Sequence, residues 1–147
     1  MITTTDQAEL TSWLCERIGL IASPNMRCIG RLNSENKLIG VVGFDGYNGT
    51  SVMMHVAGEG NWISRNLLAA AFDYPFRVMG CNVVLGSVPS GNVAAQRLNL
   101  RLGFRTDAEI PGGHPDGALY LMSMQRYECR WIAQQPVQQH AMQHRLH

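Results

Sequence analysis

Two stretches of the sequence hold the residue types that can do chemistry, and the first is residues 51–65. His55 is the only titratable side chain in the apolar segment SVMMHVA (51–57), and an imidazole can act as a general base near neutral pH. Gly58 and Gly60 follow, and a predicted helix starts soon after them. Small residues before a helix N-terminus expose backbone N–H groups, so this segment predicts a cradle for an anion such as a phosphate.

The second stretch, residues 92–104, is an amphipathic helix with a polar start. Asn92 is a favoured N-cap residue, and the apolar residues after it repeat at steps of three and four. Gly103 supplies a helix stop, and Phe104 begins the next apolar segment. Taken alone, the pattern predicts a capped helix between two strands and no particular activity.

Helical and strand periodicities alternate along the chain. Thr5 or Asp6 can cap a first helix, which Gly19 ends. Residues 63–78 predict a buried helix, and Pro75 must terminate or kink it near its end. The predicted strands are residues 27–32, 37–44, 51–57, 82–88, 104–110 and 118–124. This alternation predicts an α/β fold with a central mixed sheet and helices on both faces.

Length and composition limit the classes of function. The chain of 147 residues is sized for one domain, which we expect to span residues 1–131. The formal net charge is +1 and no stretch concentrates the 12 Lys and Arg residues, so nucleic acid is not an expected partner. The four cysteines stand far apart without metal-ligand spacing, which predicts reduced thiols, no metal site and no disulfide framework.

The two ends of the chain bear on its location and its boundaries. The N-terminal sequence MITTTDQAEL lacks the pattern of a signal peptide, and no apolar span reaches membrane length, so the expected location is the cytoplasm. Residues 132–147 are rich in Gln and His and predict a flexible tail. There His140, His144 and His147 would share a helical face and could chelate a metal, but a solvated tail is the favoured interpretation.

The order of elements, and above all residues 58–104, resembles the GNAT family of N-acetyltransferases; within this part stands the segment AAAFDYPFRVMGCNVVLGSVPSGNVAAQRLNLRLGF (69–104). The segment is most similar to the branch that contains the ribosomal-protein alanine acetyltransferases and small phage-encoded proteins. By order of elements the resemblance covers roughly residues 6–127. It implies the GNAT acyl-CoA acyltransferase fold, in which acetyl-CoA enters where two parallel strands splay apart. Those strands would be residues 51–57 and 82–88.

The resemblance also implies which residues contact acetyl-CoA. The N–H of Val56 or Ala57 would bind the thioester carbonyl, and the pyrophosphate would lie at the start of the following helix. Ser90 and Asn92 would lie at the mouth of the second strand, near the pantetheine. The implied cofactor-binding residues are Val56, Ala57, Gly58, Gly60, Asn61, Ser64, Arg65, Ser90 and Asn92. The catalytic candidates are His55, as the base, and Asn92.

The sequence departs from the family pattern at three positions. Residues 59–64 read EGNWIS where the family has Q/R-x-x-G-x-G/A, so Trp62 replaces a glycine. Glu59 places a carboxylate where a neutral or cationic side chain usually stands, and it would repel a pyrophosphate by about 1 kcal/mol or more. Asn99 stands where many members have a tyrosine acid, although the same branch often lacks that tyrosine.

Further polar residues are weaker candidates. Glu59 is a second candidate base, and Tyr120 could reach the acceptor side, although packing at a strand position is favoured. His114, in the predicted turn 111–117, is expected to be exposed. Three carboxylates could attract a cationic amine, with solvation in loops as the default: Asp107, Glu109 and Asp116.

Two functions are therefore weighed. The first is an N-acetyltransferase that transfers acetyl from acetyl-CoA to an amine of a protein or small molecule, such as a polyamine. The alternative is a non-catalytic binding protein on the same scaffold, for example a phage-encoded modulator of a host protein in the host cytoplasm. The altered loop and the missing tyrosine favour the second, and the intact 92–104 element favours the first, which we adopt. A modifier of transfer RNA would need a basic surface, and exposed sheet edges leave a homodimer open.

Overall fold

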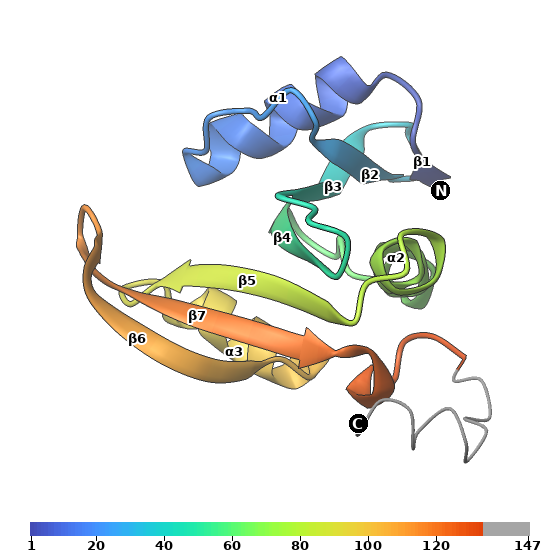
Figure 1. Ribbon diagram of the computed structural model, residues 1–147. Helices are drawn as coiled ribbons and strands as arrows, with labels where there is room; N and C mark the ends of the chain where they lie inside the picture. Colours follow the sequence, from blue (N-terminus) through green and yellow to red (C-terminus); the bar gives the residue numbers. More distant parts are fainter. Residues whose placement is uncertain (134–147) are drawn as a thin grey trace, which may run out of the picture.

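The computed structural model describes residues 1–133 and contains one seven-stranded mixed sheet (Figure 1). Its strands are β1 (Ile2–Thr3), β2 (Arg27–Leu32), β3 (Leu38–Asp45), β4 (Ser51–Gly58), β5 (Val83–Pro89), β6 (Arg105–His114) and β7 (Gly117–Gln125). The helices are α1 (Gln7–Ile18), α2 (Arg65–Asp73) and α3 (Val93–Leu102), with a π-helical turn η1 (Tyr74–Val78) and a 3-10 turn η2 (Arg126–Glu128). The strand order is β1-β2-β3-β4-β5-β7-β6, and among these strands only β4 and β5 pair in parallel.

The predicted helices on both faces of the sheet are confirmed. α1 packs on one face through Leu10 and Leu14, in a cluster with Val41 of β3. The next residue of β3, Val42, points to the opposite face because side chains alternate along a strand. There it belongs to the larger cluster, which also contains the buried residues of α2 and α3.

The helix that follows β4 differs at its start from the predicted range 63–78. It begins at Arg65 because Ser64 has an extended backbone and its hydroxyl oxygen accepts a hydrogen bond from the N–H of Leu67 at 3.1 Å. Near its end the α-helix gives way to η1, which contains Pro75. Proline has no N–H to donate to the helical ladder, so the predicted distortion at this residue is confirmed.

The last two strands form a longer hairpin than the sequence predicts. β6 extends to His114, so most of the predicted turn 111–117 is strand. β6 lies at the edge of the sheet, where Pro111 is tolerated, and its register with β7 shifts between Ile110 and His114. The prediction was wrong here because two prolines and three glycines are more typical of a loop than of a strand.

The described residues bear on the expected absence of a membrane span but not on the predicted tail. Within residues 1–133, no helix is both long and apolar enough to cross a lipid bilayer. The predicted tail from residue 134 onward, with His140, His144 and His147, lies outside the described residues.

Candidate functional site

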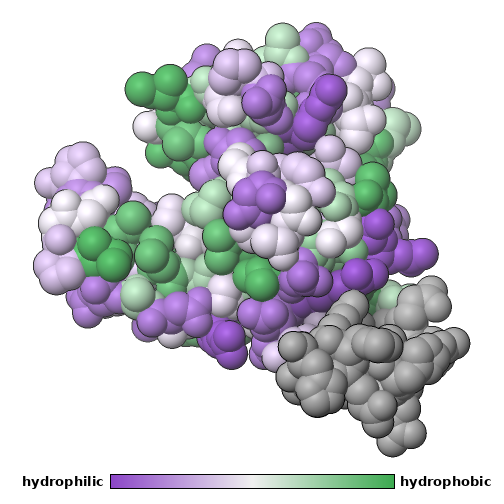
Figure 2. Space-filling model, viewed as in Figure 1, coloured by the Kyte–Doolittle hydropathy of each residue, from purple (hydrophilic) through white to green (hydrophobic). Residues whose placement is uncertain are grey.

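The sheet opens at the seam between β4 and β5. These strands pair at three positions only, Ser51–Met53 with Val83–Leu85. Beyond them β4 continues beside β3 to Gly58, whereas β5 continues beside β7 to Pro89. Figure 1 shows β5, β6 and β7 leading away from β4, and Figure 2 shows the surface hollowed between the two parts. The predicted splaying of the two parallel strands is therefore present.

Backbone groups of β4 face this opening. The N–H of Glu59 donates to the carbonyl of Ile39 at 2.9 Å, so Glu59 bonds toward β3. The bonding direction alternates along an antiparallel strand, and the N–H and C=O groups of Val56 and Gly58 therefore point away from β3. β5 no longer pairs with β4 at this level, so these groups face the opening. Of the two alternative donors that the sequence left open, Val56 and Ala57, Val56 has its N–H on the side of the opening.

The start of α2 presents free backbone donors. Because Ser64 caps the N–H of Leu67, the N–H groups of Arg65 and Asn66 are those without a partner inside the helix. The Arg65 side chain is exposed and forms no ion pair with the rest of the described chain. Free N–H groups, the positive end of the helix dipole and a guanidinium together suit an anion.

Trp62 and Arg31 hold the loop between β4 and α2. The indole of Trp62 lies over Gly58, where a Cβ atom would come within 2.0 Å of the ring. Gly58 therefore has a packing role, which the sequence did not indicate. Arg31 donates to the carbonyl of Asn61 at 2.6 Å. Gly60, with φ 57° and nothing within 4 Å of a Cβ position, is the loop glycine that leaves space for a ligand.

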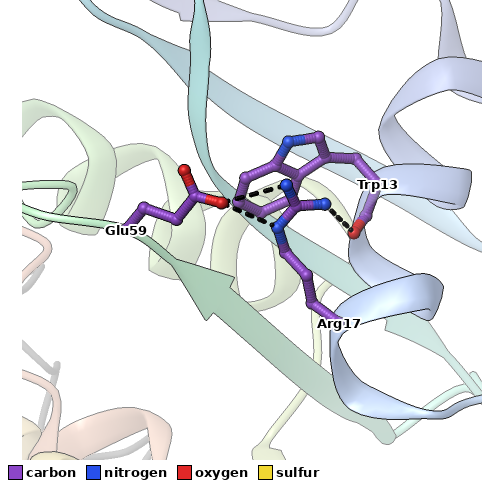
Figure 3. Close-up of polar contacts among 3 residues, drawn as sticks. All are labelled: Trp13, Arg17 and Glu59. Carbon is purple, nitrogen blue, oxygen red and sulfur yellow. Dashed lines mark hydrogen bonds and ion pairs between the residues drawn. The ribbon is translucent and has the colours of Figure 1, made fainter.

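Glu59 is paired with α1. Its Oε1 atom accepts hydrogen bonds from Nε and Nη2 of Arg17, at 3.2 and 3.0 Å (Figure 3). The same guanidinium lies 3.5 Å from the ring centroid of Trp13, and its Nη1 donates to the Trp13 carbonyl at 3.0 Å. In the sequence Glu59 reads as a candidate base or as a repulsive charge; in the fold its charge is met by a cation from a distant segment.

His55 is paired with a carboxylate that the sequence did not single out. Nε2 of His55 lies 2.8 Å from Oδ1 of Asp45, and the two side chains are 14% and 18% exposed. A partly buried carboxylate beside an imidazole fixes the orientation of the ring and the place of its proton. Asp45 was missed because it reads as the first residue of a turn, and only the register of β3 with β4 brings it beside His55.

The polar residues at the end of β5 lie across the opening and organise the start of α3. Oδ1 of Asn92 accepts a hydrogen bond from the N–H of Ala95 at 3.1 Å, which confirms the predicted cap. The carbonyl of Ser90 accepts one from Nε2 of Gln96 at 2.9 Å. Predicted site residues therefore lie on both sides of the opening, with His55 on β4 and with Ser90 and Asn92 directly after β5.

The remaining polar candidates lie apart from one another. Nδ2 of Asn99 lies 3.7 Å from a methionine sulfur of β7, and Tyr120 is half-buried on the same strand. Asp107 accepts hydrogen bonds from the hydroxyl of Ser123 and from a neighbouring arginine. Glu109 lies on β6 and Asp116 at the tip of the hairpin, and both side chains are exposed.

The cysteines offer no thiolate. Burial raises the pKa of the thiols of Cys15, Cys28, Cys81 and Cys129, so all four favour the protonated form. All four are free. Within the described part of the chain, no group of three or more His, Cys, Asp or Glu residues could hold a metal ion.

Solved structures of spermidine N-acetyltransferase SpeG from Vibrio cholerae share this fold. A dodecameric form in an intermediate state aligns at a TM-score of 0.68 and 16% identity over 86% of this chain and 93% of that chain. A complex with CoA and spermine aligns at a TM-score of 0.62 and 18% identity, over 82% of this chain and 76% of that chain. A SpeG mutant aligns at a TM-score of 0.72 and 15% identity, over 86% of this chain and 95% of that chain. No protein-family model and no curated protein matches the sequence. The likeness confirms the predicted GNAT acyltransferase fold.

Proposed function

We propose that this protein is an N-acetyltransferase that moves an acetyl group from acetyl-CoA to an amine. The observation that carries the proposal is the opening beyond the three paired positions of β4 and β5, into which the backbone of Val56 and Gly58 points. The shared fold supports it, since one SpeG structure is a complex with CoA and spermine.

The chain offers a binding edge and an anion site for acetyl-CoA. The free edge of β4 suits the amide groups of the pantetheine arm, which can pair with it as a strand would. The free N–H groups of Arg65 and Asn66 suit the pyrophosphate. Bound acetyl-CoA would supply an electrophilic thioester carbonyl and a thiolate leaving group. The N–H of Val56 then stabilises negative charge on the carbonyl oxygen.

His55 is the proposed general base, and Asp45 is its partner. The 2.8 Å bond between Nε2 and Asp45 leaves Nδ1 of His55 to take a proton from the attacking amine. The amine nitrogen then forms the C–N bond as the C–S bond of the thioester breaks. His55 and Val56 are neighbours on β4, so the base and the carbonyl donor are held by one strand. Asn92, at the end of β5, is the proposed contact across the opening.

Finer assignments extend the proposal. The segment 69–104 supports a place near the branch of ribosomal-protein alanine acetyltransferases and small phage-encoded proteins. The acceptor is an amine of a protein or small molecule, and the SpeG neighbours support spermidine and spermine as the first compounds to test. We place the protein in the cytoplasm, where acetyl-CoA is available, and in the host cytoplasm if a phage encodes it. A dodecameric neighbour supports self-association, with a homodimer as the smallest form.

Calorimetric titration with acetyl-CoA, followed by an assay of free-thiol release, tests the proposal. We expect micromolar binding and turnover with one member of a panel of spermidine, an N-terminal peptide and a lysine peptide. The double variant Ser64→Ala, Arg65→Ala should bind acetyl-CoA more weakly, while Arg77→Ala, at the far end of the same helical segment, serves as the matched control. An absence of binding at millimolar acetyl-CoA would overturn the enzyme and favour the non-catalytic binding protein.

A further inference from the structure

We propose that Arg17, on α1, is a positioning residue for the cofactor, because it neutralises Glu59 and so lets a polyanionic ligand bind at the start of α2. The inference rests on the proposed function and deepens it. It names a residue outside the opening on which phosphate binding depends.

Glu59 poses an electrostatic problem for the proposed phosphate site. It is the only acidic residue between residues 51 and 72, the stretch that contains β4, the loop and most of α2. Its backbone is fixed at the end of β4 by the bond from its N–H to the carbonyl of Ile39. The free N–H groups of α2 follow in the same segment. CoA carries several negative charges on its phosphates, and an unpaired carboxylate close to them would weaken binding.

The cation that meets this charge is held in place independently of Glu59. The guanidinium of Arg17 is stacked on the indole of Trp13, and its Nη1 atom donates to the Trp13 carbonyl at 3.0 Å. This leaves Nε and Nη2 directed at the carboxylate of Glu59, as Figure 3 shows. Because stacking already restrains the side chain, pairing costs little additional conformational entropy.

The pair is too exposed to be explained by fold stability. The side chains of Arg17 and Glu59 are 34% and 48% exposed, and ion pairs with such access to water contribute little to folding. An uncompensated charge at the loop affects ligand binding more than folding, because it attracts or repels every phosphate of a nearby ligand. Arg17 therefore acts on the ligand through Glu59.

A double-mutant cycle separates this role from a direct or structural one. Binding of CoA is measured by calorimetry for the wild type, Arg17→Ala, Glu59→Gln and the double variant Arg17→Ala, Glu59→Gln. We expect Arg17→Ala to weaken CoA binding by roughly fivefold at low ionic strength and less at high salt. Glu59→Gln alone should bind CoA at least as tightly as the wild type, and the double variant should regain wild-type affinity.

Two controls make the cycle decisive. Pantetheine lacks the phosphates, so its binding should be unchanged by Arg17→Ala. Arg77→Ala removes an arginine that is paired with Asp73 and similarly exposed, and it should leave CoA affinity unchanged. Circular dichroism checks folding, and Arg17→Gln replaces Arg17→Ala if the latter unfolds.

The outcomes distinguish the inference from the proposed function. If the wild type does not bind CoA, the proposed function fails, and this inference fails with it. If the wild type binds CoA but the double variant binds as weakly as Arg17→Ala, Arg17 acts by contact or by folding, and only the inference is overturned. Equal weakening for CoA and pantetheine would also overturn it.

Discussion

The two halves of the sheet differ in how many of their faces are covered. In the N-terminal half (residues 1–80), α1 packs on one face and α2 on the other, and Leu14 is 0% exposed. In the C-terminal half (residues 81–133), α3 packs on the face of β7 where Met122 is 1% exposed, while Leu121, which points the other way, is 38% exposed.

This difference places the proposed chemistry on the more firmly held half. β4 carries His55 and Val56 and is packed from both faces, whereas β5, on the other side of the opening, is part of a half in which the described helices cover one face. A base and a carbonyl donor need fixed positions to work. The comparison can be tested with matched substitutions, one in each half.

The largest effect is expected in the free energy of unfolding, where Leu14→Ala should lose much more than Leu121→Ala. Leu14 is fully buried between α1 and the sheet, so its truncation leaves a cavity and should cost about 2–5 kcal/mol of unfolding free energy. Leu121 is 38% exposed, so Leu121→Ala should cost about 1 kcal/mol of unfolding free energy or less. Urea denaturation of both variants measures this. Equal losses would mean that the surface around Leu121 is covered in solution.

The second difference is in kcat, between His55→Gln and His114→Gln. If His55 is the base, its loss should lower kcat on the order of 10²-fold, about 2.7 kcal/mol of barrier, with the KM for acetyl-CoA little changed. His114 lies at the tip of the β6–β7 hairpin and should leave kcat unchanged. Asp45→Asn should lower kcat less than His55→Gln does, because it removes the partner that orients the ring and leaves the base in place. A His55→Gln enzyme with full activity would remove His55 from the mechanism.

The third difference is between two glycines at the borders of the opening. A Cβ on Gly58 would lie 2.0 Å from the Trp62 ring, so Gly58→Ala should displace the indole and cost about 1–3 kcal/mol of unfolding free energy. Gly91, after β5, has nothing within 4 Å of a Cβ position and no positive φ. Gly91→Ala should therefore change stability by about 0.5 kcal/mol or less. A neutral Gly58→Ala would show that the indole can move aside.

The same residues show what the sequence could predict. The order of the helices and of strands β2 to β7, the cap at Asn92 and the distortion at Pro75 follow from local propensity, and these predictions are confirmed. Of the two caps that the sequence left open for α1, the structure has Asp6, and β1 was not among the predicted strands. Contacts made across the fold leave no local pattern. Asp45 meets His55 only through strand register, and Arg17 meets Glu59 only after α1 packs on the sheet.

The smallest difference concerns the two helix caps beside the opening. Ser64 and Asn92 each accept one backbone hydrogen bond at 3.1 Å, so replacing either with Ala should cost about 1 kcal/mol of unfolding free energy. The two variants should differ in their affinities for CoA and pantetheine. Ser64 organises the proposed phosphate site, so Ser64→Ala should weaken CoA and leave pantetheine unchanged, whereas Asn92→Ala, at the proposed pantetheine end, should weaken both alike. The same calorimetric titrations measure this, and the opposite pattern would reverse the proposed direction of the cofactor along the opening.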